Sequence, residues 1–176
     1  MMNIEFAFLD FIQKYMTSPI MDRVMVFITG LGNSGTLWIV IAFLMICSKK
    51  YRATGIMLAV GLLGSLLAGN IILKPLVGRM RPFQVREGIE LLINAPRDFS
   101  FPSGHTLASV ISATILILRE RKLGYIAAIL AFLIAFSRLY LYVHFPTDVI
   151  AGIIIGIVIG ILSVKLVNSK IGKDIN

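Results

Sequence analysis

Three short polar clusters contain the residues of this chain that could carry out chemistry. They are residues 74–82, 102–105 and 137–148. The chain has two histidines, His105 and His144, and both fall within these clusters. The clusters also contain lysine, arginine and aspartate. Brought together, such side chains could hold a phosphate group and break its ester bond, with histidine as the attacking or proton-transferring group.

The positive charge for binding phosphate could come from Lys74, Arg81 and Arg138. Arginine offers a planar fork that matches phosphate, whereas lysine acts as a point charge. Pro102-Ser103-Gly104 is typical of a helix start with Ser103 as the N-cap. Free N–H groups around Gly104 would then favour an anion, and a glycine lets the phosphate approach closely. Each cation alone could instead be an anchor that reaches the lipid headgroups.

His144 and Asp148 are the pair best suited to attack phosphorus. A neutral imidazole can attack when a carboxylate holds one ring nitrogen as N–H and the other carries the lone pair. Asp148 follows His144 by four residues, close enough for this role at the start of a helix. His105 could protonate the leaving oxygen and then activate the water that cleaves the phosphohistidine. The alternative for His144 and Asp148 is a satisfied polar pair at a helix start.

A metal ion or other cofactor is not expected. Two histidines and one carboxylate beside one of them do not form the acidic cluster of a two-metal phosphatase. Glu87, Glu90 and Asp98 lie in the segment between the first two clusters, without the spacing of metal ligands. We expect these three to be solvated loop charges.

The three clusters together resemble a known signature. The patterns Lys-x6-Arg-Pro, Pro-Ser-Gly-His and Ser-Arg-x5-His-x3-Asp are similar to those of the type 2 phosphatidic acid phosphatase superfamily, and every position is matched. That family also includes soluble bacterial acid phosphatases and vanadium haloperoxidases. The resemblance implies that His144 is the nucleophile, Asp148 its partner and His105 the general acid. It implies phosphate binding by Lys74, Arg81, Ser103, Gly104 and Arg138.

The elements that must position these residues are membrane helices. Hydrophobic residues make up 57% of the chain and its mean hydropathy is +0.89, well above the values of soluble domains. Ala53–Leu73, Leu123–Tyr142 and Val149–Val167 are apolar blocks, each close to the roughly 20 residues that cross a bilayer as a helix. We therefore expect an all-α, polytopic transmembrane bundle.

Six spans are expected within a single membrane-embedded domain, residues 1–176, whose motifs lie within 74–148. The expected spans are Pro19–Leu31, Thr36–Ser48, Ala53–Leu73, Gly104–Leu118, Leu123–Tyr142 and Thr147–Val167. The turn Gly32-Asn33-Ser34-Gly35 would separate the first two. The amphipathic segment Ile4–Met16 would lie in the interface or extend the first span. It lacks the pattern of a cleaved signal peptide, so we expect it to be retained.

The distribution of basic residues predicts the orientation. Lysines and arginines cluster at 49–52, 119–122 and 165–173, all on one side of a six-span bundle. Such clusters mark the cytoplasmic side, so both termini would be cytoplasmic and the motifs would face outward from the plasma membrane. The same bias accounts for the net charge of +8. Because no basic stripe alternates with aromatic residues, nucleic acid is not an expected partner.

Six cations nevertheless fall on the outer face, which the orientation rule disfavours: Lys74, Arg79, Arg81, Arg86, Arg97 and Arg138. An anionic ligand would compensate for them. Arg79, Arg86 and Arg97 could contact a second phosphate, or could be headgroup or surface charges.

Small residues recur along the last expected span, at Gly152, Gly156 and Gly160. This spacing lets helices approach closely. It is compatible with packing inside the bundle or with a homodimer seam.

We therefore expect an integral membrane phosphatase that acts on lipid-linked phosphate or diphosphate through a phosphohistidine. Its partners would be that substrate and the membrane lipids. Small size and an outer active face favour undecaprenyl diphosphate, converted to undecaprenyl phosphate, in a cell envelope. Phosphatidylglycerophosphate and phosphatidate are the alternatives, because the phosphate-binding residues do not distinguish their tails. A translocator of phosphorylated lipid is the main alternative outside enzymes, followed by a structural or adaptor protein.

Overall fold

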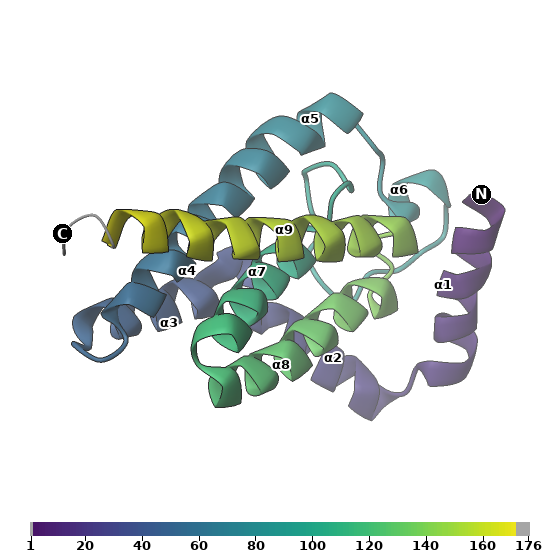
Figure 1. Ribbon diagram of the computed structural model, residues 1–176. Coiled ribbons are helices and arrows are strands. Elements are labelled where there is room, and N and C mark those ends of the chain that lie inside the picture. Colours follow the sequence, from purple (N-terminus) through teal and green to yellow (C-terminus); the bar gives the residue numbers. More distant parts are fainter. Residues whose placement is uncertain (1, 172–176) are drawn as a thin grey trace.

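Long apolar stretches force the backbone to satisfy its own hydrogen bonds, which favours helices. The computed structural model describes residues 2–171, and every regular element within them is helical (Figure 1). The expected all-α class is confirmed. The elements are α1 (Met2–Met16), α2 (Pro19–Leu31), η1 (Asn33–Gly35), α3 (Thr36–Cys47), α4 (Arg52–Ser65), η2 (Leu66–Leu73), α5 (Lys74–Val77), α6 (Pro82–Val85), α7 (Gly104–Arg119), α8 (Arg121–Tyr140) and α9 (Pro146–Ile171).

Helix α7 lies at the centre and packs against α4, α8 and α9. Its contact with α9 explains the glycine spacing. A Cβ atom added to Gly156 would lie 2.9 Å from Val110, and one added to Gly160 would lie 2.8 Å from Thr114. Gly152 meets α7 in the same way. The glycine face of α9 therefore packs inside the bundle against α7.

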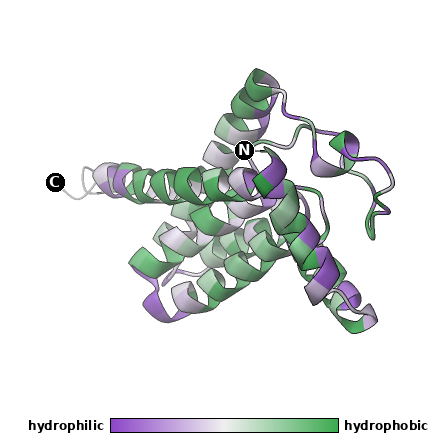
Figure 2. Cartoon of the chain, turned by 90° about the vertical axis from the view of Figure 1, so that its right-hand side faces the viewer, coloured by the Kyte–Doolittle hydropathy of each residue, from purple (hydrophilic) through white to green (hydrophobic). Residues whose placement is uncertain are grey.

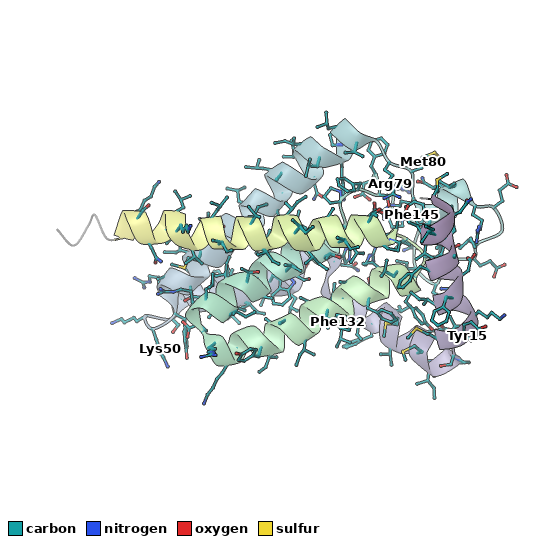
Figure 3. All side chains as sticks on the ribbon, turned by 45° about the vertical axis from the view of Figure 1, so that its right-hand side comes forward. Tyr15, Lys50, Arg79, Met80, Phe132 and Phe145 are labelled. Carbon is teal, nitrogen blue, oxygen red and sulfur yellow. The ribbon has the colours of Figure 1, made fainter. Side chains whose placement is uncertain are left out.

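The outer surfaces of the helices are apolar. On α8, Ile126, Ile129 and Phe132 are exposed, and Phe132 lies on the outside of the bundle in Figure 3. On α9, Ile150 and Ile154 are exposed as well. A surface of this kind belongs against lipid acyl chains, as Figure 2 also indicates along the helices.

The length and composition of the described helices do not confirm the expected six spans. Three helices are long and apolar enough to cross a membrane: Arg52–Val85, Arg121–Tyr140 and Pro146–Lys170. A fourth span is possible if Pro19–Leu31 and Asn33–Cys47 count as one, since they form a pair bent by 42°. Helix α7 is apolar but shorter. The first two expected spans correspond to the two helices of this bent pair.

The turn at η1 produces this bend. Ser34 and Gly35 both adopt left-handed backbone conformations, with φ values of 51° and 67°. Such residues interrupt the helix without having to reverse the chain. The turn also brings Asn33 next to His105 on α7, with Asn33 Oδ1 3.0 Å from His105 Nε2. The turn predicted at residues 32–35 is present, but the helices on its two sides are bent by 42° and do not run antiparallel.

Helix α1 lies across the end of the bundle that carries the linker between α8 and α9, and the C-terminal end of α9 lies at the opposite end (Figure 1). Its apolar face buries Phe6, Leu9 and Ile12, which fits an interfacial amphipathic helix. We expected both termini on one side. The two ends of the described chain lie at opposite ends of the bundle, and the side of the membrane on which each lies stays a prediction.

Candidate active site

The three polar clusters converge around one open cavity of about 1340 Å³. Lys74 begins α5 after the π-helical η2, Arg81 is the N-cap of α6, and His105 lies in the first turn of α7. Six of the eight residues expected in the site line the cavity: Lys74, Arg81, Gly104, His105, Arg138 and His144. Asp148 lies behind His144 and is fully buried.

The hydrogen bonds around His144 assign its tautomer. Its Nε2 lies 3.0 Å from a guanidinium nitrogen of Arg81. A guanidinium only donates hydrogen bonds, so Nε2 carries the lone pair and Nδ1 carries the hydrogen. Nδ1 faces Asp148 Oδ2 at 3.5 Å, a distance that must shorten for a strong hydrogen bond. This is the tautomer that an attacking Nε2 needs.

Burial keeps His144 neutral. The side chain is almost completely enclosed, and this burial lowers the pKa of His144 below its ordinary value. Asp148 opposes the shift by stabilising the imidazolium form, while the positive charges of Arg81 and Arg138 add to it. The imidazole at the linker between α8 and α9 is therefore unprotonated at neutral pH.

Asp148 is held by more groups than the sequence indicated. Its Oδ2 accepts hydrogen bonds from Ser100 Oγ at 2.5 Å and from the Phe145 backbone N–H at 2.8 Å. Ser100 Oγ also lies 3.4 Å from His144 Nδ1. Ser100 was not singled out from the sequence, because a serine in a loop before Pro102 carries no pattern of its own. Together these donors keep the buried carboxylate ionised and oriented.

His105 has a more open environment. Its Nε2 lies 3.0 Å from Asn33 Oδ1, so the amide oxygen accepts the Nε2 hydrogen and Nδ1 carries a lone pair. A Cβ atom at Gly32 would lie 2.7 Å from His105 Cδ2, so only glycine fits there. The sequence predicted the turn at 32–35 but not that Asn33 would orient a histidine. A cavity-lining imidazole of this kind can exchange a proton with a bound ligand.

Arg138 has unused hydrogen-bonding capacity. Its side chain is 2% exposed, and one of its terminal nitrogens donates to Thr29 Oγ1 at 2.5 Å. Its Nε is buried and finds no acceptor among the described residues. A buried donor without an acceptor costs free energy unless a ligand supplies one. An anion in the cavity would do so.

Asp98 corrects one expectation. We expected a solvated loop charge, but Asp98 forms ion pairs with both Lys74 and Arg81, the latter at 2.8 Å. Burial opposes its ionisation, yet the two cations outweigh this effect and lower the pKa of Asp98 to about 2. Its side chain is half-exposed. The loop thus supplies an internal anion at the cations expected to bind phosphate, whereas Glu87 and Glu90 are exposed as expected.

Ser103 and Gly104 form the helix start that the sequence predicted. Ser103 is the N-cap of α7, and its hydroxyl accepts hydrogen bonds from the N–H and the hydroxyl of Thr106. It is fully buried and does not line the cavity, so its hydroxyl serves the cap. Gly104 does line the cavity, where a Cβ atom would be 3.6 Å from Lys74 Nζ, an ordinary contact. No protein neighbour requires a glycine at this position, and the close approach of a phosphate to Gly104 stays a prediction.

The remaining outer-face arginines do not surround the cavity. Arg79 binds Glu5 and Asp148, and Arg86 binds Asp10. Their guanidinium groups are therefore committed to carboxylates rather than to headgroups. In the part of the chain that the structure describes, no three His, Cys, Asp or Glu side chains are grouped to hold a metal ion.

Known proteins resemble this chain in sequence and in fold. The model of the PAP2 superfamily matches residues 53–171. An undecaprenyl-diphosphatase from Sulfolobus acidocaldarius is 35% identical over 83% of this chain and 70% of its own length. The crystal structure of a transmembrane PAP2-type phosphatidylglycerolphosphate phosphatase from Bacillus subtilis is 29% identical with a TM-score of 0.76, covering 97% of this chain and 87% of that one. That of Aquifex aeolicus LpxE is 31% identical with a TM-score of 0.78, covering 89% and 92%.

Proposed function

We propose that this chain, which belongs to the PAP2 superfamily and is a membrane lipid phosphatase, hydrolyses undecaprenyl diphosphate to undecaprenyl phosphate through a phosphohistidine on His144. The observation that carries this proposal is the neutral His144 at the wall of a cavity rich in arginine and lysine. Its lone pair lies on Nε2, beside Arg81. This arrangement suits attack on a phosphorus atom held by cations.

In the first step, the N–H of Arg81 moves from His144 Nε2 to an oxygen of the phosphate, and the freed Nε2 lone pair forms a bond to the terminal phosphorus. The bond from that phosphorus to the bridging oxygen breaks, and the leaving lipid phosphate takes the proton from Nδ1 of His105, which enters this step in its imidazolium form. Asp148 stabilises the imidazolium through Nδ1–H. Lys74, Arg81 and Arg138 neutralise the oxygens of the transferred group, together with N–H groups at the start of α7. Asp98 must leave two of these cations for the phosphate to bind.

In the second step, His105 takes a proton from a water molecule, and the resulting hydroxide attacks the phosphohistidine. The P–N bond breaks, inorganic phosphate is released, and His144 regains its lone pair. His105 ends the cycle protonated and ready to serve as the acid again. The role of Asn33 is to hold the ring of His105 at the cavity wall.

The decisive experiment uses purified protein in detergent with chelator present. The intact chain should release phosphate from a lipid diphosphate, which a translocator would not do. His144→Ala should abolish turnover while the helical content by circular dichroism stays unchanged. Denaturation during turnover should trap an acid-labile, base-stable phosphate on His144. Appreciable activity of His144→Ala, or activity that needs added magnesium, would overturn the mechanism.

The choice of lipid is supported by the relative from Sulfolobus acidocaldarius. Apolar residues of α2, α3 and α4, among them Val26, Ile39 and Leu62, line the cavity beside the polar site and would contact the tail. The similarity to a phosphatidylglycerolphosphate phosphatase supports the alternative substrate. Rates on undecaprenyl diphosphate, phosphatidylglycerophosphate and phosphatidate at one mole fraction in detergent would decide. The proposal requires the highest kcat/KM for the diphosphate.

We also infer the topology of this single membrane domain. The basic clusters at 49–52 and 119–122 lie at the end opposite Arg79, as Lys50 shows in Figure 3, and Lys165 and Lys170 follow on the last helix. Lys173, part of the third cluster, lies outside the described residues. That end would be cytoplasmic and the catalytic end extracytoplasmic, with α1 on the outer surface of the plasma membrane.

Five crossings fit this arrangement: the bent pair of α2 and α3, the helix from α4 through η2, and helices α7, α8 and α9. Helix α7 would cross despite its length because other helices cover it. In a Cys47→Ser background, a cysteine replacing Glu90 should react with an impermeant maleimide in intact cells or spheroplasts. A cysteine replacing Lys122 should react only after lysis. The reverse pattern would place the site in the cytoplasm.

A further inference from the structure

A buried ionic network lies behind Asp148, on the side away from His144. While Oδ2 of Asp148 faces His144, its Oδ1 accepts a hydrogen bond from a terminal nitrogen of Arg79 at 2.6 Å. The same nitrogen lies 2.6 Å from Thr147 Oγ1. The other terminal nitrogen of Arg79 donates to Glu5 Oε2 at 2.7 Å. Arg79 therefore joins the aspartate beside His144 to a carboxylate of α1.

Glu5 is anchored on both of its oxygens. Its Oε1 accepts a hydrogen bond of 2.5 Å from the hydroxyl of Thr147, in the first turn of α9, and Glu5 is only 6% exposed. The guanidinium of Arg79 also lies 4.1 Å from the centre of the Phe145 ring, as Figure 3 shows at the bundle end. Phe145 in turn packs edge-on against Phe6 of α1. The guanidinium of Arg79 is thus held by the carboxylate of Glu5 and by the ring of Phe145.

The physical consequence concerns the orientation of Asp148. A fully buried carboxylate needs partners for both oxygens, and here Ser100 and Phe145 supply them for Oδ2 while Arg79 supplies them for Oδ1. With Oδ1 held, the carboxylate cannot turn its plane away from His144 Nδ1. Without Glu5, the guanidinium of Arg79 would lose the carboxylate that binds its second terminal nitrogen. The network therefore restrains the one residue that must stabilise the imidazolium.

We propose that Glu5 and Arg79 are positioning residues for catalysis, and that α1 is part of the catalytic apparatus rather than only a membrane anchor. This inference rests on the proposed function, in which Asp148 supports a nucleophilic His144. Arg79 acts on the reaction through Asp148, and Glu5 acts through Arg79. Neither is expected to contact the phosphate group, because neither lines the cavity.

The same helix supplies a matched control. Asp10 of α1 forms an ion pair with Arg86 at 2.6 Å, and Arg86 lies 4.3 Å from the ring of Phe6. This pair joins the same two parts of the chain as Glu5 and Arg79 do. It is more exposed, and its further hydrogen bond goes to Tyr142 instead of Asp148. Loss of the Asp10 pair therefore tests the docking of α1 without touching the carboxylate that faces His144.

The experiment compares Glu5→Gln with Asp10→Asn in the full purified chain. Residues that orient a catalytic group from behind typically change activity by about 10- to 100-fold. We expect Glu5→Gln to lower kcat to that extent, while KM and the inhibition constant of inorganic phosphate change by less than about threefold. Asp10→Asn should stay within about twofold of the intact chain in all three quantities. Arg79→Met should lower kcat further, and adding Glu5→Gln to it should have no additional effect.

Equal kcat values for Glu5→Gln and Asp10→Asn would overturn the inference. So would parallel losses in kcat and phosphate affinity, because these indicate damage to the whole site. His144→Ala is assayed in the same experiment. It distinguishes a failure of the positioning role of Glu5 from a failure of the proposed function. If His144→Ala is inactive while Glu5→Gln matches the control, only the positioning role is lost. If His144→Ala is active, the proposed function itself fails. Glu5→Gln keeps the shape of the side chain. The comparison of Glu5→Gln with Asp10→Asn can therefore be made even if Arg79→Met does not fold.

Discussion

The two histidines of the site differ in their surroundings. His144 lies in the linker between α8 and α9, is almost fully buried, and contacts Arg81 on one nitrogen and Asp148 on the other. His105 lies on the first turn of α7, is partly exposed to the cavity, and has one side-chain partner, Asn33. One imidazole is held on both ring nitrogens, and the other on one.

This difference fits the two chemical roles. A nucleophile must present the same lone pair along one line of attack, so restraint of the ring through Nδ1 raises the fraction of productive encounters, while the Arg81 N–H must leave Nε2 before it attacks. A proton donor and acceptor must reach the leaving oxygen in one step and water in the next, which requires access to the cavity. The contrast between His144 and His105 is thus the one that their proposed roles require.

After the loss of His144 itself, the loss of its partner Asp148 should show the largest effect. In Asp148→Asn, the amide cannot stabilise an imidazolium, and its NH2 group would face the Phe145 N–H, the Ser100 hydroxyl or Arg79. We expect kcat on the lipid substrate to fall by about 10⁴-fold, as for the equivalent change in a hydrolase triad. The folded fraction should remain measurable by size exclusion in detergent. A loss below about tenfold would mean that Asp148 does not support His144.

The open histidine should show an effect that depends on the leaving group. His105→Ala should lower kcat for a lipid diphosphate by about 10²- to 10⁴-fold, the usual contribution of a general acid or base. p-Nitrophenyl phosphate has a leaving group that needs no proton, so the rate of phosphoryl transfer from it to His144 should be unchanged in His105→Ala. The water step would still lack its base, and phosphohistidine should accumulate. Equal losses on both substrates without accumulation would remove His105 from the acid role.

The sequence predicts the helices well where apolar runs are long and uninterrupted. The expected spans Leu123–Tyr142 and Thr147–Val167 match α8 and α9 to within a few residues. The start of α7 follows from Ser103, whose side chain caps it as predicted. The number of spans was harder to predict because Gly32-Asn33-Ser34-Gly35 can either reverse a chain or bend it. Only packing against α7 and α8 decides between these outcomes.

The members of the site were predictable where they belong to a dense motif, as six of the eight expected residues line one cavity. Their supporting contacts were not predictable. Glu5 and Arg79 are 74 positions apart, and Asn33 and His105 are 72 apart. Such pairs meet only after α1 and η1 dock on the bundle. Asp98 was misassigned for the same reason, since its spacing gives no sign that the loop folds back over Lys74.

Asn33 should have an intermediate effect on the open histidine. Asn33→Ala removes the only side chain that contacts the His105 ring nitrogens among the described residues, and leaves the ring free to rotate. We expect kcat to fall by about fivefold, because a single neutral hydrogen bond contributes about 1 kcal/mol. Asn94→Ala provides the control, as this side chain also lines the cavity but has no hydrogen bond to either histidine. An Asn33→Ala enzyme as active as Asn94→Ala would show that His105 needs no such support.

The smallest effect should come from Asp98, which touches neither histidine but competes for two of the cations. Asp98→Asn removes the negative charge from Lys74 and Arg81, so inorganic phosphate should inhibit about two- to fivefold more tightly, in the range of a partly exposed ion pair. The pKa of Asp98 is lowered to about 2, so the carboxylate and its ion pairs persist above about pH 4 and are lost only as the pH falls toward 2. The ratio of inhibition constants between the two proteins should therefore be constant from about pH 5 to pH 8. A ratio that changes across this range, or phosphate binding weakened by Asp98→Asn, would mean that Asp98 organises the cations for phosphate instead of competing with it.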